Sequence, residues 1–158
     1  MLIKNSQGIT TIEILIVMVI IAVVSSMSVV SYTNWKRQVK LINTQEEIKS
    51  TIVRAQQLAT AASENEIWGV HFEIDKYVLF SGSFYDENNI NNKVWTLQGV
   101  RIADPENSLA DGAGGYGPDL FFYKFIGTTA NTGTITIMPT GESNASKSII
   151  VNASGQID

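Results

Sequence analysis

The chain has 158 residues, a length that suits a single domain, and 11 basic against 15 acidic residues give it a net charge of −4. Hydrophobic residues make up 44% of the chain and charged residues 16%, so it is too apolar and too weakly charged to be disordered. The absence of Cys excludes disulfide scaffolds and thiolate zinc sites, and the single His excludes any metal motif that needs two histidines.

Glycine and proline divide the sequence into two unlike parts. Residues 9–68 contain neither, which is compatible with one very long helix, whereas residues 69–158 hold 11 of the 12 Gly and all 3 Pro. Frequent Gly and Pro are typical of short strands joined by turns. We therefore expect an α+β fold, in which a long N-terminal helix packs on a C-terminal antiparallel β domain.

The first part opens with a polar leader over residues 1–8 and then an uncharged segment. No charged residue occurs in the 22 residues from Ile14 to Trp35. As a helix this segment would extend roughly 33 Å, enough to cross the hydrocarbon core of a bilayer. We expect residues 9–35 to form a transmembrane helix. The alternative is an ordinary signal peptide cut near Val23-Val24-Ser25 or Ser26-Met27-Ser28, which are weak matches to a cleavage site.

Glu13 lies between Ile12 and Ile14, at the start of the apolar segment. A carboxylate inside the bilayer is costly unless another charge pairs with it. The same side chain close to the interface could instead lie among the lipid headgroups. The residue types alone leave both interpretations open.

The run Gly8-Ile9-Thr10-Thr11-Ile12-Glu13-Ile14-Leu15 resembles the class III signal of type IV pilins and type II secretion pseudopilins. The resemblance implies that a prepilin peptidase cuts after Gly8, and that Ile9 becomes the mature, N-methylated first residue in place of the usual Phe. It also implies an assembly role for Glu13, because in this family the glutamate at the fifth mature position pairs with the N-terminal amine of a neighbouring subunit. Opposite charges attract far more strongly in a medium of low dielectric than in water.

The flanking charges disagree with the orientation that this resemblance implies. Lys4 is the only basic residue of the leader, whereas Lys36, Arg37 and Lys40 follow the apolar segment. The positive-inside rule alone would place the second group in the cytoplasm. The cleavage motif implies the opposite, namely a single-pass protein of the inner membrane with its C-terminal domain outside the cytoplasm, which joins a filament after assembly.

Residues 36–64 are expected to continue the helix as an amphipathic segment. Apolar residues recur there at steps of three and four, with one member missing near Gln45. They are Trp35, Val39, Ile42, Ile48, Ile52, Ala55, Ala59 and Ala62. We expect residues 48–62 to pack on the β domain and the part nearer Trp35 to pack in a filament core.

Residues 65–158 are expected to form a β-rich globular domain with short connections between antiparallel strands. The predicted strands cover residues 67–74, 77–84, 94–97, 100–103, 120–126, 134–138, 148–152 and 156–157. The ending resembles minor pseudopilins of the H type and related minor pilins. It runs from Ile135-Thr136-Ile137-Met138-Pro139-Thr140-Gly141 through Ile149-Ile150-Val151 to Gly155-Gln156-Ile157.

The β domain offers few candidate sites. His71 alternates with apolar residues on a predicted strand and is expected to be a solvated side chain. Asp104, Asp111 and Asp119 could bind Ca²⁺, which prefers oxygen ligands, although their spacing matches no known calcium loop. The competing interpretation is that residues 104–119 form a mobile surface loop rich in Gly and Pro. No other cofactor or metal is expected. Asn144 and Asn152 each begin an N-x-S glycosylation pattern.

The sequence contains no hydrolase elbow, phosphate loop or HExxH motif. Nucleic acid is not an expected partner, because only 7 basic residues stand against 14 acidic ones after residue 40. The resemblance implies a non-enzymatic minor subunit of a type II secretion pseudopilus or a type IV pilus. Its partners would be other pilin-like subunits, the prepilin peptidase and the inner membrane. The alternatives are a membrane-anchored extracytoplasmic ligand-binding protein and a hydrolase that uses the carboxylates of residues 104–119.

Overall fold

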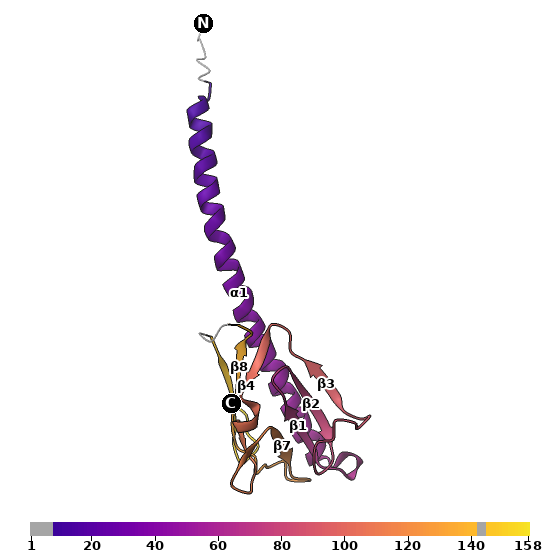
Figure 1. Ribbon diagram of the computed structural model, residues 1–158. Coiled ribbons are helices and arrows are strands. Elements are labelled where there is room, and N and C mark those ends of the chain that lie inside the picture. The colour runs from indigo at the N-terminus through magenta and orange to yellow at the C-terminus, as the bar shows by residue number, and fades with distance from the viewer. Residues whose placement is uncertain (1–7, 142–144) are drawn as a thin grey trace. The chain divides into compact units, whose positions relative to one another are not determined.

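The computed structural model describes residues 8–141 and 145–158, without the side chains of residues 26–31 (Figure 1). Contacts divide the chain into two units, residues 1–37 and residues 38–158, which we describe separately. Helix α1 (Thr11–Thr60) begins in the first unit and ends in the second. The leader residues 1–7, Asn144 and the side chains of Ser26, Met27 and Ser28 lie outside the described part, so the predictions made for them stay predictions.

Thr10 and Glu13 define the beginning of α1. The backbone N–H of Glu13 donates to the carbonyl oxygen of Thr10 at 3.1 Å and lies 3.4 Å from its hydroxyl oxygen, so Thr10 acts as the N-cap. A Thr followed three residues later by a Glu is the sequence of a capping box, and a negative charge in the first turn also suits the helix dipole. The helix therefore begins where the polar leader gives way to the apolar segment.

In the second unit, one stripe of α1 enters the hydrophobic core. Its buried apolar members are Leu41, Ile48, Ile52, Ala55 and Ala59, and the buried hydroxyl residues Thr44 and Thr51 continue the stripe. Leu41 and Thr44 take the places predicted for Val39 and Ile42, and Ile42 is exposed instead. Both members lie two residues beyond the predicted positions, because the true series follows the 3.6-residue helical repeat back from Ile48.

The four-stranded sheet of this unit has the order β3-β2-β1-β7, with every pair antiparallel. Its strands are β1 (Trp68–Phe72), β2 (Lys76–Ser81), β3 (Lys93–Thr96) and β7 (Asp119–Phe122). Trp68, Val70 and Phe72 point to the core that contains the α1 stripe, so Gly69 and His71 lie on the opposite face. We call this opposite face the outer face of the sheet.

The second sheet has the order β4-β8-β5-β6, and β9 pairs with β8. Its strands are β4 (Val100–Ala103), β5 (Leu109–Ala110), β6 (Tyr116–Gly117), β8 (Gly133–Pro139) and β9 (Lys147–Val151). Ile135 and Ile137 of β8 and Ile149 of β9 belong to the same core as the α1 stripe. Two glutamines of α1 bind backbone carbonyls here, since Gln45 donates to Ser148 and Gln56 to Gly127, each at 2.8 Å.

The structure confirms the predicted α+β class and corrects several boundaries. The helix ends at Thr60 rather than at residue 64, and a short 3-10 helix (Ser63–Asn65) follows it. The strand predicted over 120–126 stops at Phe122, because the chain turns there and the N–H of Tyr123 donates to the carbonyl of Thr128. The strand predicted over 156–157 is reduced to one bridge between Ile157 and Val151.

Residues 104–119 are more ordered than the mobile loop that the composition indicated. They contain a 3-10 helix (Pro105–Asn107) and the short strands β5 and β6, which pair with each other. The hydroxyl of Ser108 donates to the carbonyl of Asp104 at 2.8 Å, and Pro105, Ser108 and Leu109 are buried. A side-chain hydrogen bond to the backbone and several buried residues therefore give this Gly-rich stretch a defined conformation.

Candidate functional site

The first candidate region is the N-terminal segment around Gly8, Ile9 and Glu13. Gly8 precedes the helix, is exposed, and has open space where a Cβ would stand. Ile9 and Glu13 are also exposed. The large apolar side chains from Ile9 to Val24 are between 49% and 73% exposed. The structure thus places the predicted cleavage residue in an accessible position next to a helix whose apolar surface is uncovered.

The helical conformation predicted for residues 9–35 is confirmed from Thr11 onward, where α1 begins. Within the described portion of the chain, we find no helix with both the length and the apolar character that a membrane crossing requires. The crossing of a membrane by residues 9–35 stays a prediction.

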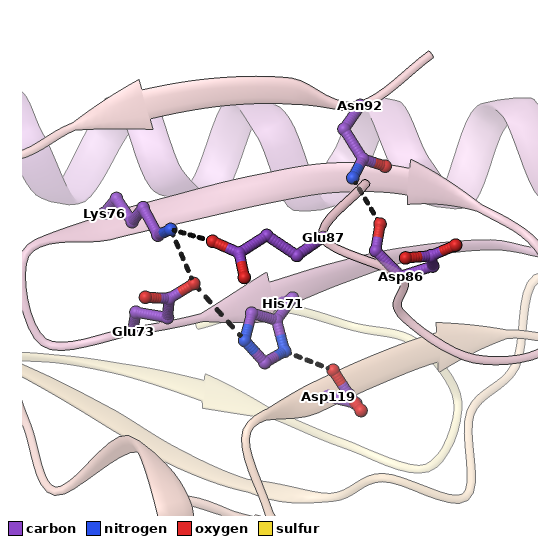
Figure 2. A network of polar contacts seen from close by, with 7 residues as sticks. All are labelled: His71, Glu73, Lys76, Asp86, Glu87, Asn92 and Asp119. Carbon is purple, nitrogen blue, oxygen red and sulfur yellow. Dashed lines mark hydrogen bonds and ion pairs between the residues drawn. The ribbon is translucent and has the colours of Figure 1, made fainter. Parts of the chain in front are cut away.

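The second candidate region is a polar network on the outer face, centred on His71 of β1 (Figure 2). Nδ1 of His71 lies 2.6 Å from Oδ1 of Asp119 on the neighbouring strand β7, and its Nε2 lies 3.7 Å from Oε1 of Glu73. The side chain is only 14% exposed, so the prediction of a solvated His71 is wrong. Antiparallel pairing causes this environment, since the register places His71 directly opposite Asp119.

Lys76 extends the network toward the loop of residues 82–92. Its Nζ lies 3.0 Å from Oε1 of Glu73 and 3.6 Å from Oε1 of Glu87 (Figure 2). The hydrogen bond to Glu73 is the main reason that the pKa of Lys76 is raised above its ordinary value of 10.5. Glu73 therefore connects the histidine to the lysine, and Lys76 connects both to the loop.

Aromatic rings hold the same loop against the outer face. Tyr85 stacks on His71, with ring centroids 3.8 Å apart, and its edge meets Phe80 at 5.5 Å. Phe80 in turn packs edge-to-face with Phe121 of β7 at 5.4 Å. Gly69 permits this arrangement, because a Cβ there would lie 2.9 Å from Cζ of Phe80. Burial raises the pKa of the Tyr85 phenol above its ordinary value of 10.0.

The loop itself is built around Asp86 and Asn92. Oδ1 of Asp86 accepts from the N–H of Asn88 at 3.0 Å, and Nδ2 of Asn92 donates to the carbonyl oxygen of Asp86 at 2.7 Å. Oδ1 of Asn92 is buried without a hydrogen-bond partner among the residues that are described. Sequence reasoning missed this outer-face cluster. It forms because strand pairing brings together His71 and Asp119, which are 48 residues apart, and no local sequence pattern reveals that pairing.

The three carboxylates considered as calcium ligands do not converge. Asp104 accepts from Nδ2 of Asn107, and Asp119 is engaged with His71. Oδ1 of Asp111 accepts from the N–H groups of Ala113 and Gly115 at 2.8 Å, which lowers the pKa of Asp111. Over residues 8–141 and 145–158 the structure contains no group of three or more His, Asp or Glu side chains placed to hold a metal ion. The geometry therefore does not support a calcium site formed by Asp104, Asp111 and Asp119.

The architecture is that of a pilin-like protein: a long N-terminal helix whose second half packs on antiparallel sheets. Two solved structures with this arrangement are of the minor pseudopilin EpsH from the type 2 secretion system of Vibrio cholerae. One has a TM-score of 0.53 at 14% identity, covering 75% of this chain and 94% of that one. The other has a TM-score of 0.52 at 15% identity, covering 77% and 93%.

The TM-scores of 0.53 and 0.52 show a shared fold, as the resemblance at the C-terminal end predicted, and identities of 14% and 15% carry the comparison no further than the fold. No family model matches the chain, and no curated protein matches it.

Proposed function

We propose that this chain is a minor structural subunit of a pilus-like filament, without enzymatic activity, and that the filament is a type II secretion pseudopilus or a type IV pilus. The observation that carries the proposal is the pilin-like fold, which it shares with the minor pseudopilin EpsH. That similarity favours the pseudopilus. The exposed Gly8, three residues before the start of α1, agrees with a peptidase site at this position.

The proposed assembly mechanism is electrostatic and apolar. Cleavage after Gly8 would create a positive α-amino group on Ile9, four residues before Glu13. In the filament, the carboxylate of Glu13 would pair with the amine of a neighbouring subunit, while the exposed apolar side chains of residues 9–24 pack against adjacent helices. The charge pair would set the register, because leaving either charge alone in an apolar filament core is costly.

Before assembly, residues 9–35 would anchor the subunit in the inner membrane, with the β domain outside the cytoplasm. The support is the absence of any charged residue between Ile14 and Trp35. The partners would be the prepilin peptidase, the inner membrane and other pilin-like subunits. The acidic balance of the β domain argues against a nucleic-acid partner.

Mass spectrometry of the protein isolated from membranes with an active prepilin peptidase tests the proposal. We expect the mature chain to begin at Ile9 and to carry an N-methyl group. A chain that keeps Met1, or one cut near Ser25 or Ser28, would refute the pilin assignment and favour an anchored binding protein or a secreted one. A Gly8→Ala variant is the matched control, since it should remain uncut while its β domain folds normally.

A further inference from the structure

The two edges of the four-stranded sheet differ in how their backbone groups are satisfied. At the β7 edge, the N–H of Phe121 donates to Oδ1 of Asn131 at 3.2 Å and the N–H of Tyr123 donates to the carbonyl of Thr128 at 2.9 Å. These contacts satisfy two of the outward N–H groups at the β7 edge and place the segment around residues 128–131 beside it. The opposite edge is β3, which has no further strand beside it in the described sheet (Figure 1).

The register shows which backbone groups of β3 point away from the sheet. The N–H of Glu73 donates to the carbonyl of Lys76, so the backbone N–H and C=O groups of the even-numbered residues of β2 point toward β1. The backbone groups of the odd-numbered residues of β2 consequently point toward β3. The hydrogen bond from the N–H of Leu97 to the carbonyl of Asp75 confirms this. The N–H and C=O groups of Val94 and Thr96 therefore point outward, and no partner for them is found among the described residues.

A groove of about 720 Å³ lies between β3 and the polar flank of α1. Tyr77 and Trp95 line it from the sheet, with their rings stacked at 5.4 Å and nearly parallel. The helix side consists of Asn43, Glu46, Glu47, Ser50, Thr51 and Arg54. A strand added beside β3 would direct every second side chain into this groove, because side chains alternate between the faces of a sheet.

The charges in the groove are separated along the helix. Glu46 and Glu47 lie toward one end and Arg54 toward the other. Glu47 and Arg54 lie seven positions apart along the helix, which corresponds to roughly 10 Å, and two strand residues on the same face that lie four positions apart are separated by about 13 Å. Long charged side chains bridge the difference of about 3 Å, so a basic and an acidic residue at this spacing would match the groove.

We propose that the open edge of β3 binds an extended segment of another protein as a fifth strand of the sheet. Backbone hydrogen bonds to Val94 and Thr96 would provide affinity, and a basic and an acidic side chain four positions apart would enter the groove opposite Glu47 and Arg54. An apolar side chain between them would lie over Trp95. The inference concerns residues 38–158, which include the second half of α1, and it does not depend on filament assembly.

The probe is a fluorescein-labelled eight-residue peptide of alternating threonine and valine, in which a lysine and a glutamate stand four positions apart. Binding to the full-length chain in detergent micelles is followed by fluorescence anisotropy. The expected result is saturable binding that weakens about tenfold or more in Val94→Pro, because proline removes the outward N–H but no bond to β2. Val94→Thr, which keeps that N–H, should bind as the original chain does, and near-ultraviolet circular dichroism verifies that each variant is folded.

The charge contacts are tested separately with Glu47→Lys, which should weaken binding several-fold, against Glu66→Lys, an exposed position outside the groove. A second peptide with the lysine and glutamate three positions apart should bind more weakly, since its charges lie on opposite faces. Failure of both peptides to bind, or equal binding by Val94→Pro, would overturn the proposal. So would light scattering that shows a dimer lost in Val94→Pro, because the edge would then belong to a second copy of this chain.

Discussion

The imidazole of His71 and the phenol ring of Tyr85 lie stacked, with centroids 3.8 Å apart and planes inclined by 13°. This contact joins strand β1 to the loop of residues 82–92, on the face of the sheet that α1 does not cover. Asp119 of β7 and Glu73 of the β1–β2 turn flank the imidazole, so the loop packs on a ring whose orientation is held from both sides. The loop is thereby fixed to the sheet through aromatic and ionic contacts together.

Tyr85→Ala should release the loop from the outer face. The ring contacts with His71 and Phe80 would be lost, and we expect a destabilisation of about 1 to 2 kcal/mol. Urea unfolding measures the change in stability, and hydrogen exchange measures the increased opening of residues 84–92. Tyr85→Phe keeps both ring contacts and should cost much less; an equally large loss in that variant would show that the hydroxyl, and not the stacking, holds the loop.

Gly69→Ala should be strongly destabilising although the substitution adds only a methyl group. The new Cβ would lie 2.7 Å from the carbonyl oxygen of Leu120 and 2.9 Å from Cζ of Phe80. Since the backbone oxygen cannot move without disturbing the β1–β7 pairing, we expect a loss of about 2 kcal/mol. Thermal unfolding checks this value. Gly117→Ala is the matched control, because a Cβ there meets nothing within 4 Å, and a similar loss there would contradict the steric explanation.

Alkaline pH should detach the same loop. Burial raises the pKa of Tyr85 above 10.0, and the hydrogen bond to Glu73 raises the pKa of Lys76 above 10.5. Both groups bind their protons more tightly in the folded state. Their contribution to the stability of the fold is therefore fully present below pH 10 and is lost as the pH rises through the raised pKa values. Amide hydrogen exchange is base-catalysed and too fast to follow at such pH. The ultraviolet absorbance of tyrosinate is therefore the suitable measurement.

In that titration, Tyr85 and Tyr77 should both ionise above the ordinary tyrosine pKa of 10.0. The step from Tyr85 should disappear in Tyr85→Phe and persist in Tyr116→Phe, where the tyrosine removed is exposed. Tyr77, whose pKa burial also raises, contributes a second late step that both variants keep. If Tyr85→Phe leaves every late step in place, the burial of Tyr85 does not control its ionisation.

Glu13→Ala should leave the protein in the membrane but reduce its incorporation into filaments about tenfold or more. Removing the carboxylate leaves the neighbouring α-amine without its partner in an apolar environment, and a factor of ten corresponds to only about 1.4 kcal/mol. Co-purification with filaments, compared with the amount in the membrane fraction, measures the effect. Thr11→Ala, in the same helical turn, is the control. Equal incorporation of the Glu13 variant would disprove the proposed charge pairing.

The sequence by itself determined the class of the fold. Sixty residues without Gly or Pro predict a long helix, and alternating apolar residues such as Val70 and Phe72 predict strands, because both patterns depend on neighbours within a few positions. The same local reasoning found β4 at Val100–Ala103 without error. It also identified Gly8 and Glu13 as candidates, since that motif is read directly from adjacent residues.

Only the tertiary structure decided the environment of His71 and the properties of the sheet edges. The imidazole meets Asp119, 48 positions away, and its other ring nitrogen meets Glu73. Val94 and Thr96 form an open edge because β2 pairs with one side of β3 and no strand in the described part of the chain pairs with the other. Contacts between distant segments depend on register and strand order, and those follow from packing the whole core, not from any local period of the sequence.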